Sequence, residues 1–314
     1  MKLQHVLGCG TDPKLYPESP LLVSSTDFIG IEVELEQMDI GSSMYDSIRP
    51  HNFWSTVHED SIRQGGELIF AEPLCGANII AALDEYEAFL ERFKGKMGRL
   101  PVISDRCSLH THLDVRDLEI TTINTVAILY VLYEKVIFQF LNPSRYRNNY
   151  CIGLGSTNFS SILADMPIPT GDGYKYSSYV QESCDKYGAM NYLSTMGHGS
   201  LEFRGHPGSF NKGDIITWIN MLLSLKTFAR KFEPEGLPVA FIKGMDATSL
   251  TNEIFGEDAF KLIQTNFFQD NFNYGKSWMT ETLLRGKLKD DTLKSLKDKR
   301  NPDVKLIDKY KEAN

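Results

Sequence analysis

The sequence lacks several features that would place the protein in a common class. Its five cysteines are scattered, odd in number and never spaced as CxxC, which argues against a disulfide framework and a zinc knuckle. The N-terminal segment has no basic start followed by an apolar run, so we expect no secretory signal. No P-loop pattern GxxxxGK[ST] occurs. The scattered cysteines fit a protein of the reducing cytoplasm.

Long hydrophobic runs are also missing. The most membrane-like stretch, Ile120–Tyr133, has 14 uncharged residues and is ended by Glu134 and Lys135. A span across a bilayer needs about 20 predominantly apolar residues. The stretch therefore predicts a buried helix, and we expect no membrane contact.

Positive charge is scarce except near the C-terminus. The net charge of −8 argues against general nucleic-acid binding. Residues 285–314 nevertheless hold 10 basic and 6 acidic side chains, which leaves 23 basic and 35 acidic side chains in residues 1–284. This difference predicts a main domain of residues 1–284 and a basic tail of residues 285–314 that forms an exposed helix.

Within the main domain, strand-like and helix-like patterns alternate. Single helices between strands, each strand with one polar face, predict an α+β domain on a largely antiparallel sheet. The turn-rich segment Gly153–Ser178 predicts a long irregular loop. The expected strands are Ile29–Glu36, Gly65–Leu74, Cys107–Val115 and Gly199–Pro207, and the expected helices are Ala77–Lys94, Thr121–Leu141 and Asp214–Lys231.

The polar faces of the four strands carry an unusual set of side chains. Residues two apart in a strand share a face, so each strand contributes one or two groups to the same surface if the strands pair. Carboxylates this dense repel one another unless a cation compensates them, and mainly oxygen ligands suit Mg²⁺ or Mn²⁺. Taken singly, each pair is also compatible with a solvated face or a surface ion pair. The groups are Glu32 and Glu34, then Glu67, then His110 and His112, then Glu202 and Arg204.

A family resemblance follows from the order of five segments. They are "GIEVE", "EDSIRQGGELIFAEPL", "SLHTHL", "RYRNNYC" and "KYGAMNYLSTMGHGSLEFRGHPGSFN". The series, from Ile29 to Asn211, resembles the amidoligase family, which is related in fold to glutamine synthetase and glutamate–cysteine ligase. The resemblance implies a saddle-shaped antiparallel sheet with helices on its outer face. It also implies ATP-dependent joining of a carboxylate to an amine through an acyl phosphate, with two or more Mg²⁺ or Mn²⁺ ions.

The resemblance also implies roles for particular residues. Glu32 and Glu34 resemble ligands of separate metals on either side of the nucleotide phosphates, and Glu67 resembles a ligand nearer the acyl acceptor. His110 and Glu202 resemble ligands of the metal at the γ-phosphate, with His112 nearer the phosphates. Arg204 resembles the guanidinium that stabilises the transferred phosphoryl group. The basic segment facing substrate or phosphate corresponds to Arg145 and Arg147.

Three departures from the family pattern leave this metal set intact. Asp60 is followed directly by Ser61 without the usual glycine, Ser108 replaces a glycine, and Lys186 replaces a frequent arginine. These departures put the substrate contacts in question.

Two other function classes remain compatible with the residues. A two-metal hydrolase or phosphotransferase could use the same face, and an inactive nucleotide-binding homologue could keep it. The partners expected for a ligase are a carboxylate, an amine and, where the amine is not free in solution, a separate amidotransferase or other amine-supplying protein.

Overall fold

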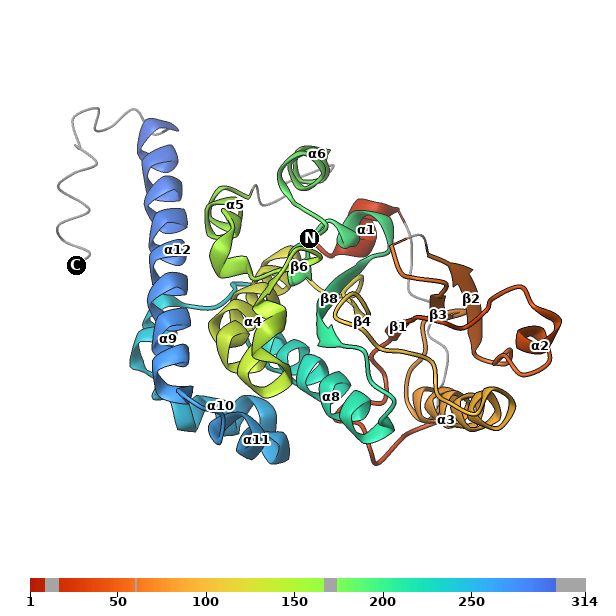
Figure 1. Ribbon diagram of the computed structural model, residues 1–314. Helices are drawn as coiled ribbons and strands as arrows, with labels where there is room; N and C mark the ends of the chain where they lie inside the picture. The colour runs from red at the N-terminus through yellow and green to blue at the C-terminus, as the bar shows by residue number, and fades with distance from the viewer. Residues whose placement is uncertain (9–16, 60, 167–173, 298–314) are drawn as a thin grey trace.

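The computed structural model describes residues 1–8, 17–59, 61–166 and 174–297, and its centre is a six-stranded antiparallel sheet (Figure 1). The strand order is β2-β3-β1-β4-β8-β7. A separate two-stranded sheet pairs β5 with β6. Together with the helices, this sheet confirms the predicted α+β class. The strands are β1 (Ile29–Leu35), β2 (Trp54–His58), β3 (Gly66–Phe70), β4 (Ser108–Asp114), β5 (Arg147–Asn148), β6 (Cys151–Ile152), β7 (Met190–Asn191) and β8 (Ser200–Pro207).

The four strands expected from the sequence are β1, β3, β4 and β8, and they lie next to one another in the sheet. The two edge strands, β2 and β7, were not expected. β7 has only two residues, too few for an alternation of apolar and polar side chains to be recognised. Its pairing with β8 depends on tertiary structure, which places Met190 opposite Phe203.

Helices cover the apolar face of the sheet. The three helices expected from the sequence are α3 (Ala77–Met97), α4 (Ile120–Leu141) and α8 (Lys212–Ala229). The indole of Trp218 on α8 donates to the Thr111 hydroxyl on β4 at 3.1 Å. The ring of Tyr130 on α4 meets Phe203 on β8 edge to face at 5.0 Å. Because this face packs against helices, the opposite face, with the acidic side chains, is left for a site.

α4 contains the apolar stretch noted in the sequence. By length and composition alone it is the one described helix that could cross a membrane, but 83% of its most apolar window is buried inside the protein. α12 lies along one side of α4 and also packs against α5 (Figure 1). α4 is therefore a core helix, as predicted.

The C-terminal third is helical. α12 continues through residue 285, so the predicted boundary between domain and tail falls inside one helix. That division stays a prediction, and residues 298–314 lie outside the described part of the chain. The helices are α9 (Val239–Gly244), α10 (Ala247–Phe255), α11 (Ala259–Ile263) and α12 (Phe268–Lys297).

The segment Gly153–Ser178 is less irregular than expected. Its apolar residues Phe159, Ile162 and Leu163 follow helical spacing and are buried on one face of α5. The many serines and glycines around them hide this short pattern. Residues 167–173 lie outside the described part of the chain. The remaining short helices are α1 (Leu3–Leu7), α2 (Ser43–Asp46), α5 (Phe159–Asp165), α6 (Tyr174–Ser183) and α7 (Ser194–Gly197).

Candidate active site

The register of the sheet brings the predicted polar side chains opposite one another. Glu32 on β1 pairs with His110 on β4. Glu34 on β1 pairs with Glu67 on β3. On the other side of β4, His112 pairs with Glu202 on β8. Directly opposite residues of an antiparallel pair have side chains on the same face. The sequence alternation therefore becomes one surface with acidic and imidazole groups.

A β-bulge between β4 and β8 adjusts this surface. The register shifts between Leu109 and Thr111, so one extra residue of β8 lies opposite His110. Along β8, Glu202 and Arg204 have their side chains on the polar face, but His206, two residues further, does not. The His206 ring lies 5.7 Å from the Trp218 ring on the helix side. Bulges are frequent beside active sites, where they re-aim side chains.

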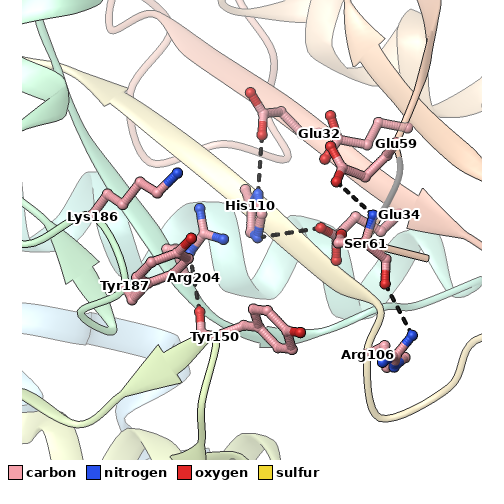
Figure 2. A pocket seen from close by; sticks show the side chains of 11 residues that line it. Glu32, Glu34, Glu59, Ser61, Arg106, His110, Tyr150, Lys186, Tyr187 and Arg204 are labelled. Atoms are coloured by element: carbon pink, nitrogen blue, oxygen red, sulfur yellow. Dashed lines mark hydrogen bonds and ion pairs between the residues drawn. The ribbon is translucent and has the colours of Figure 1, made fainter.

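A pocket of about 230 Å³ opens on the polar face (Figure 2). We call it the acidic pocket. Figure 2 shows His110 at its centre, between the carboxylates on one side and Lys186, Tyr187 and Arg204 on the other. The lining residues are Glu32, Glu34, Glu59, Ser61, Glu67, Arg106, His110, Tyr150, Lys186, Tyr187 and Arg204.

Each of the two imidazole rings is oriented by a contact of its Nδ1 atom, and its Nε2 atom has no hydrogen bond within the described part of the chain. His110 Nδ1 lies 3.0 Å from Glu32 Oε2, and His112 Nδ1 lies 2.9 Å from the Ser200 hydroxyl. The Nε2 atoms of both rings are buried and form no hydrogen bond to any described residue, although His112 Nε2 lies 3.3 Å from Glu32 Oε1. An imidazole oriented through one nitrogen, with the other nitrogen free, is a typical arrangement for a metal ligand.

Two groups of three residues have the geometry to hold a cation. In one group the potential ligand atoms of Glu32, His112 and Glu202 lie within 4.8 Å of one another. In the other the same holds for Glu32, Glu67 and His110. Glu32 belongs to both groups, so it could help to hold a cation at either one. Carboxylate oxygens with one nitrogen suit Mg²⁺ or Mn²⁺, so these residues fit the ions that the sequence predicted.

The charges in the acidic pocket are not balanced by the protein alone. Burial, followed by repulsion from Glu32, Glu34 and Glu59, raises the pKa of Glu67 to about 8. Burial would also raise the pKa of Glu32, but the close contacts and the charge of the two histidines lower it far below its usual range. Burial would lower the pKa of His112, and contact with Glu32 raises it instead. A divalent cation would relieve the repulsion at Glu67.

The structure groups the predicted ligands differently from the roles that the resemblance implied. His110 lies with Glu67 and Glu32, and His112 lies with Glu202, although His110 Nδ1 is also 3.7 Å from Glu202 Oε1. Glu34 belongs to neither group: its Oε2 accepts from the Ser108 amide at 2.6 Å. The assignment of individual ligands to individual ions stays a prediction.

Arg204 lines the acidic pocket and is held on two sides. Its guanidinium pairs with Glu202 Oε1 and donates from Nε to the Tyr150 carbonyl at 3.2 Å. Its backbone amide donates to the Ala189 carbonyl at 2.9 Å. The guanidinium therefore lies next to the group of Glu32, His112 and Glu202, where it could meet a negatively charged ligand.

The other two predicted arginines are placed differently. Arg145 is 3% exposed, and its guanidinium donates to the carbonyls of Cys107 and Arg204 at 3.3 and 3.1 Å and to the Ser108 hydroxyl at 2.7 Å. It does not line the acidic pocket. In this structure it joins β4 to β8, and its predicted contact with substrate or phosphate stays a prediction. The side chain of Arg147 lies outside the described part of the structure.

Six lining residues were not predicted as site residues, although each lies in or near a segment quoted above. Glu59 and Ser61 precede β3, and Tyr150 lies in the β5–β6 turn. Tyr187 follows Lys186, which the sequence singled out only as a departure. A hydrogen bond from the Ile152 amide to the Tyr187 carbonyl, at 2.8 Å, joins this turn to the residues before β7. The sixth residue is Arg106, which donates to the Ser61 carbonyl at 3.2 Å. No sequence pattern predicts such contacts between loops.

A comparison with protein families shows what part of the chain is similar to. The family model described as "Putative amidoligase enzyme" matches residues 79–226. This range includes β4 and β8 with both histidines, Glu202 and Arg204, and it begins after β1 and β3. The match supports the resemblance seen in the sequence. No curated protein matches the chain.

Proposed function

Because residues 79–226 match the model of a putative amidoligase family, we propose that this protein is an ATP- and Mg²⁺-dependent carboxylate–amine ligase. The observation that carries the proposal is that two groups of potential ligands share Glu32, which lines the acidic pocket together with Arg204. A carboxylate at neutral pH does not react with an amine, so one of its oxygens must first become a better leaving group. Phosphorylation by ATP provides this activation.

The proposed reaction has two steps. A carboxylate oxygen of the acid attacks the γ-phosphorus of ATP, the bond to the bridging oxygen breaks, and ADP leaves. The amine nitrogen then attacks the acyl carbon of the acyl phosphate, inorganic phosphate leaves with the former carboxylate oxygen, and the nitrogen loses a proton. Catalysis of the first step depends mainly on alignment and on neutralising charge.

Residues of this chain would provide both contributions. Glu32, Glu67, His110, His112 and Glu202 would hold Mg²⁺ or Mn²⁺, which neutralises charge on the phosphates when bound. Arg204 would donate to the equatorial oxygens of the transferred phosphoryl group through its planar guanidinium. The ligands sit on paired strands, so they need little reorganisation when charge develops.

The first test is nucleotide binding. We expect Mg-ATP to raise the melting temperature of the protein and ATP with excess chelator to raise it much less, because the cations relieve the repulsion in the acidic pocket. Glu87→Gln, an exposed substitution on α3, is the control and should behave as the wild type. A shift by ATP that chelator does not change would argue against the cation site. No shift at all would favour an inactive homologue.

The second test is the reaction itself. Pools of carboxylic acids and amines are screened with Mg-ATP for ADP release, which should require both an acid and an amine. ADP or phosphate release that is independent of any amine would favour a two-metal hydrolase or a phosphotransferase. We also propose that the protein acts in the cytoplasm, since its described cysteines 75, 107, 151 and 184 are free thiols. A separate amine-supplying protein would then be a partner.

A further inference from the structure

Asn191 on β7 lies directly opposite Glu202 on β8 and contacts it. Its Nδ2 donates to Glu202 Oε2 at 2.7 Å. The side chain is 6% exposed, and its Oδ1 is buried without a hydrogen bond to any residue that the structure describes. The polar atom left over therefore lies one side chain away from a proposed cation ligand.

The orientation of this amide is fixed by chemistry. An ionised carboxylate only accepts hydrogen bonds, so the amide must turn its NH₂ group toward Glu202. A flipped amide would set its carbonyl oxygen against Oε2. The buried atom without a partner is therefore the carbonyl oxygen, an acceptor. A buried acceptor without a donor is unfavourable, which indicates that a donor completes it in the functional state.

Resting on the cation site of the proposed function, we propose that Asn191 is a positioning residue for Glu202. Its NH₂ group holds Oε2, so that the carboxylate keeps the orientation that the group with Glu32 and His112 requires. Its Oδ1 accepts a hydrogen bond from a water molecule bound to the cation. Asn191 thus acts on the cation through Glu202 and through that water, and it is not itself a ligand.

The neighbouring contact of Glu202 shows why such a residue is needed. Oε1 pairs with the Arg204 guanidinium, and a guanidinium can bind both oxygens of a carboxylate at once. Without a partner on Oε2, Glu202 could rotate to give both oxygens to Arg204. That rotation would take the carboxylate away from the cation and the guanidinium away from the phosphoryl group. The amide of Asn191 opposes this rotation.

The test is Mn²⁺ affinity, measured by electron paramagnetic resonance or calorimetry at pH 7 without nucleotide or substrate. Asn191→Leu keeps the branching of the side chain at Cγ, at a somewhat larger volume, and removes both hydrogen-bonding groups. Loss of a residue that orients a ligand typically weakens metal binding by about 10–100-fold, and we expect this range. Asn124→Leu is the matched control. Asn124 Oδ1 accepts from the hydroxyl of Tyr192, the residue after Asn191, at 2.7 Å, and no described hydrogen bond joins Asn124 to Glu202. We expect it to change affinity by less than about twofold.

The outcomes are separable. A folded Asn191→Leu variant that binds Mn²⁺ as the wild type does, or that loses no more affinity than Asn124→Leu, overturns the proposal for Asn191. If Asn191→Leu does not fold, Asn191→Ser replaces it; a serine hydroxyl still donates to a carboxylate but offers no amide carbonyl. Unchanged affinity in Asn191→Ser then overturns the proposal. Absence of Mn²⁺ binding in the wild type removes the cation site itself, and with it the proposed function.

Discussion

Two clusters of charged side chains in this protein are balanced in opposite ways. In one, which we call the balanced cluster, Asp27 and Asp117 share Lys226 and Arg230, with contacts of 2.5–2.9 Å between nitrogen and oxygen. Burial would raise the pKa of Asp27, but Lys226 and Arg230 lower it to about 2. In the acidic pocket, by contrast, burial and the neighbouring carboxylates raise the pKa of Glu67 to about 8.

The difference separates a structural use of charge from a ligand site. The balanced cluster joins the segment before β1 and the segment after β4 to α8 and the turn after it, and its carboxylates have cations from the chain itself. The acidic pocket has carboxylates in excess. His110, which lines it, and His112, which contacts Glu32 beside it, each have a ring nitrogen without a hydrogen bond among the described residues. A protein that keeps such a pocket pays in stability unless something outside the chain supplies positive charge. That argument points to the acidic pocket, and not to the balanced cluster, as the place where ligands bind.

The largest effect is expected from removing a cation of the balanced cluster. Lys226 is 1% exposed, and Lys226→Met would leave two aspartates short of a partner. Breaking a buried ion pair costs about 3–5 kcal/mol, which urea unfolding at pH 7 would measure. Lys231→Met is the control, because the pair of Lys231 with Glu253 is exposed and should contribute less than about 1 kcal/mol. Similar losses in both variants would show that the balanced cluster does not stabilise the fold as argued.

The next largest effect is expected on the turnover number when Arg204 or Glu202 is replaced. Arg204→Lys keeps the charge but loses the planar fork, so ATP binding should survive while kcat falls by about 100-fold or more. Glu202→Gln keeps the size but removes the charge at the cation, so ATP affinity and turnover should both fall. Steady-state kinetics and calorimetry separate the two results. If Arg204 and Glu202 formed only a structural ion pair, the two variants would behave alike, with losses below about 1 kcal/mol.

A smaller effect should appear in the pH dependence of stability without divalent cations. The pKa of Asp27 is about 2 in the folded protein against 3.8 as the reference, so its contribution is present above about pH 4 and is lost as the pH falls through 2. This contribution amounts to about 2 kcal/mol. The pKa of Glu67 is raised from 4.5 to about 8, so its contribution is present below about pH 4.5 and is lost as the pH rises through 8.

Two substitutions test which cluster causes which part of this pH dependence. Asp27→Asn should flatten the acid limb, which is the change in the free energy of unfolding below about pH 4. Glu67→Gln should flatten the alkaline limb, which is the change between about pH 4.5 and pH 8. Urea unfolding from pH 2 to pH 9, in chelator, provides the measurement. Added Mg²⁺ should flatten only the alkaline limb, since it binds ionised carboxylates in the acidic pocket. An equal effect of Mg²⁺ on both limbs would mean that the cation acts elsewhere.

The sequence predicted the four central strands and three core helices because each has a clear period of apolar residues. Glu32, Glu67, His110 and Glu202 could be chosen on the same basis, since a period of two places them on one face. Sequence could not predict the bulge opposite His110, which depends on how β4 meets β8. It also missed the edge strands β2 and β7. Asn191 lies on β7, so it was not predicted either: the pairing of β7 with β8, and not the spacing of residues in the sequence, places it beside Glu202.

The smallest effect is expected from the tail, a third concentration of charge that belongs to neither cluster. In the part of α12 whose side chains the structure describes, which ends at residue 285, the buried side chains are Phe268, Phe272, Met279 and Thr282. Deleting Lys287–Asn314 should therefore keep the packing of α12 on α4 and leave Mg-ATP affinity within about twofold of the wild type. Calorimetry measures the affinity, and circular dichroism shows whether the shortened protein is folded. A folded, soluble protein that loses Mg-ATP affinity would place the basic tail in the site, and the acidic pocket would then take part of its missing positive charge from this chain.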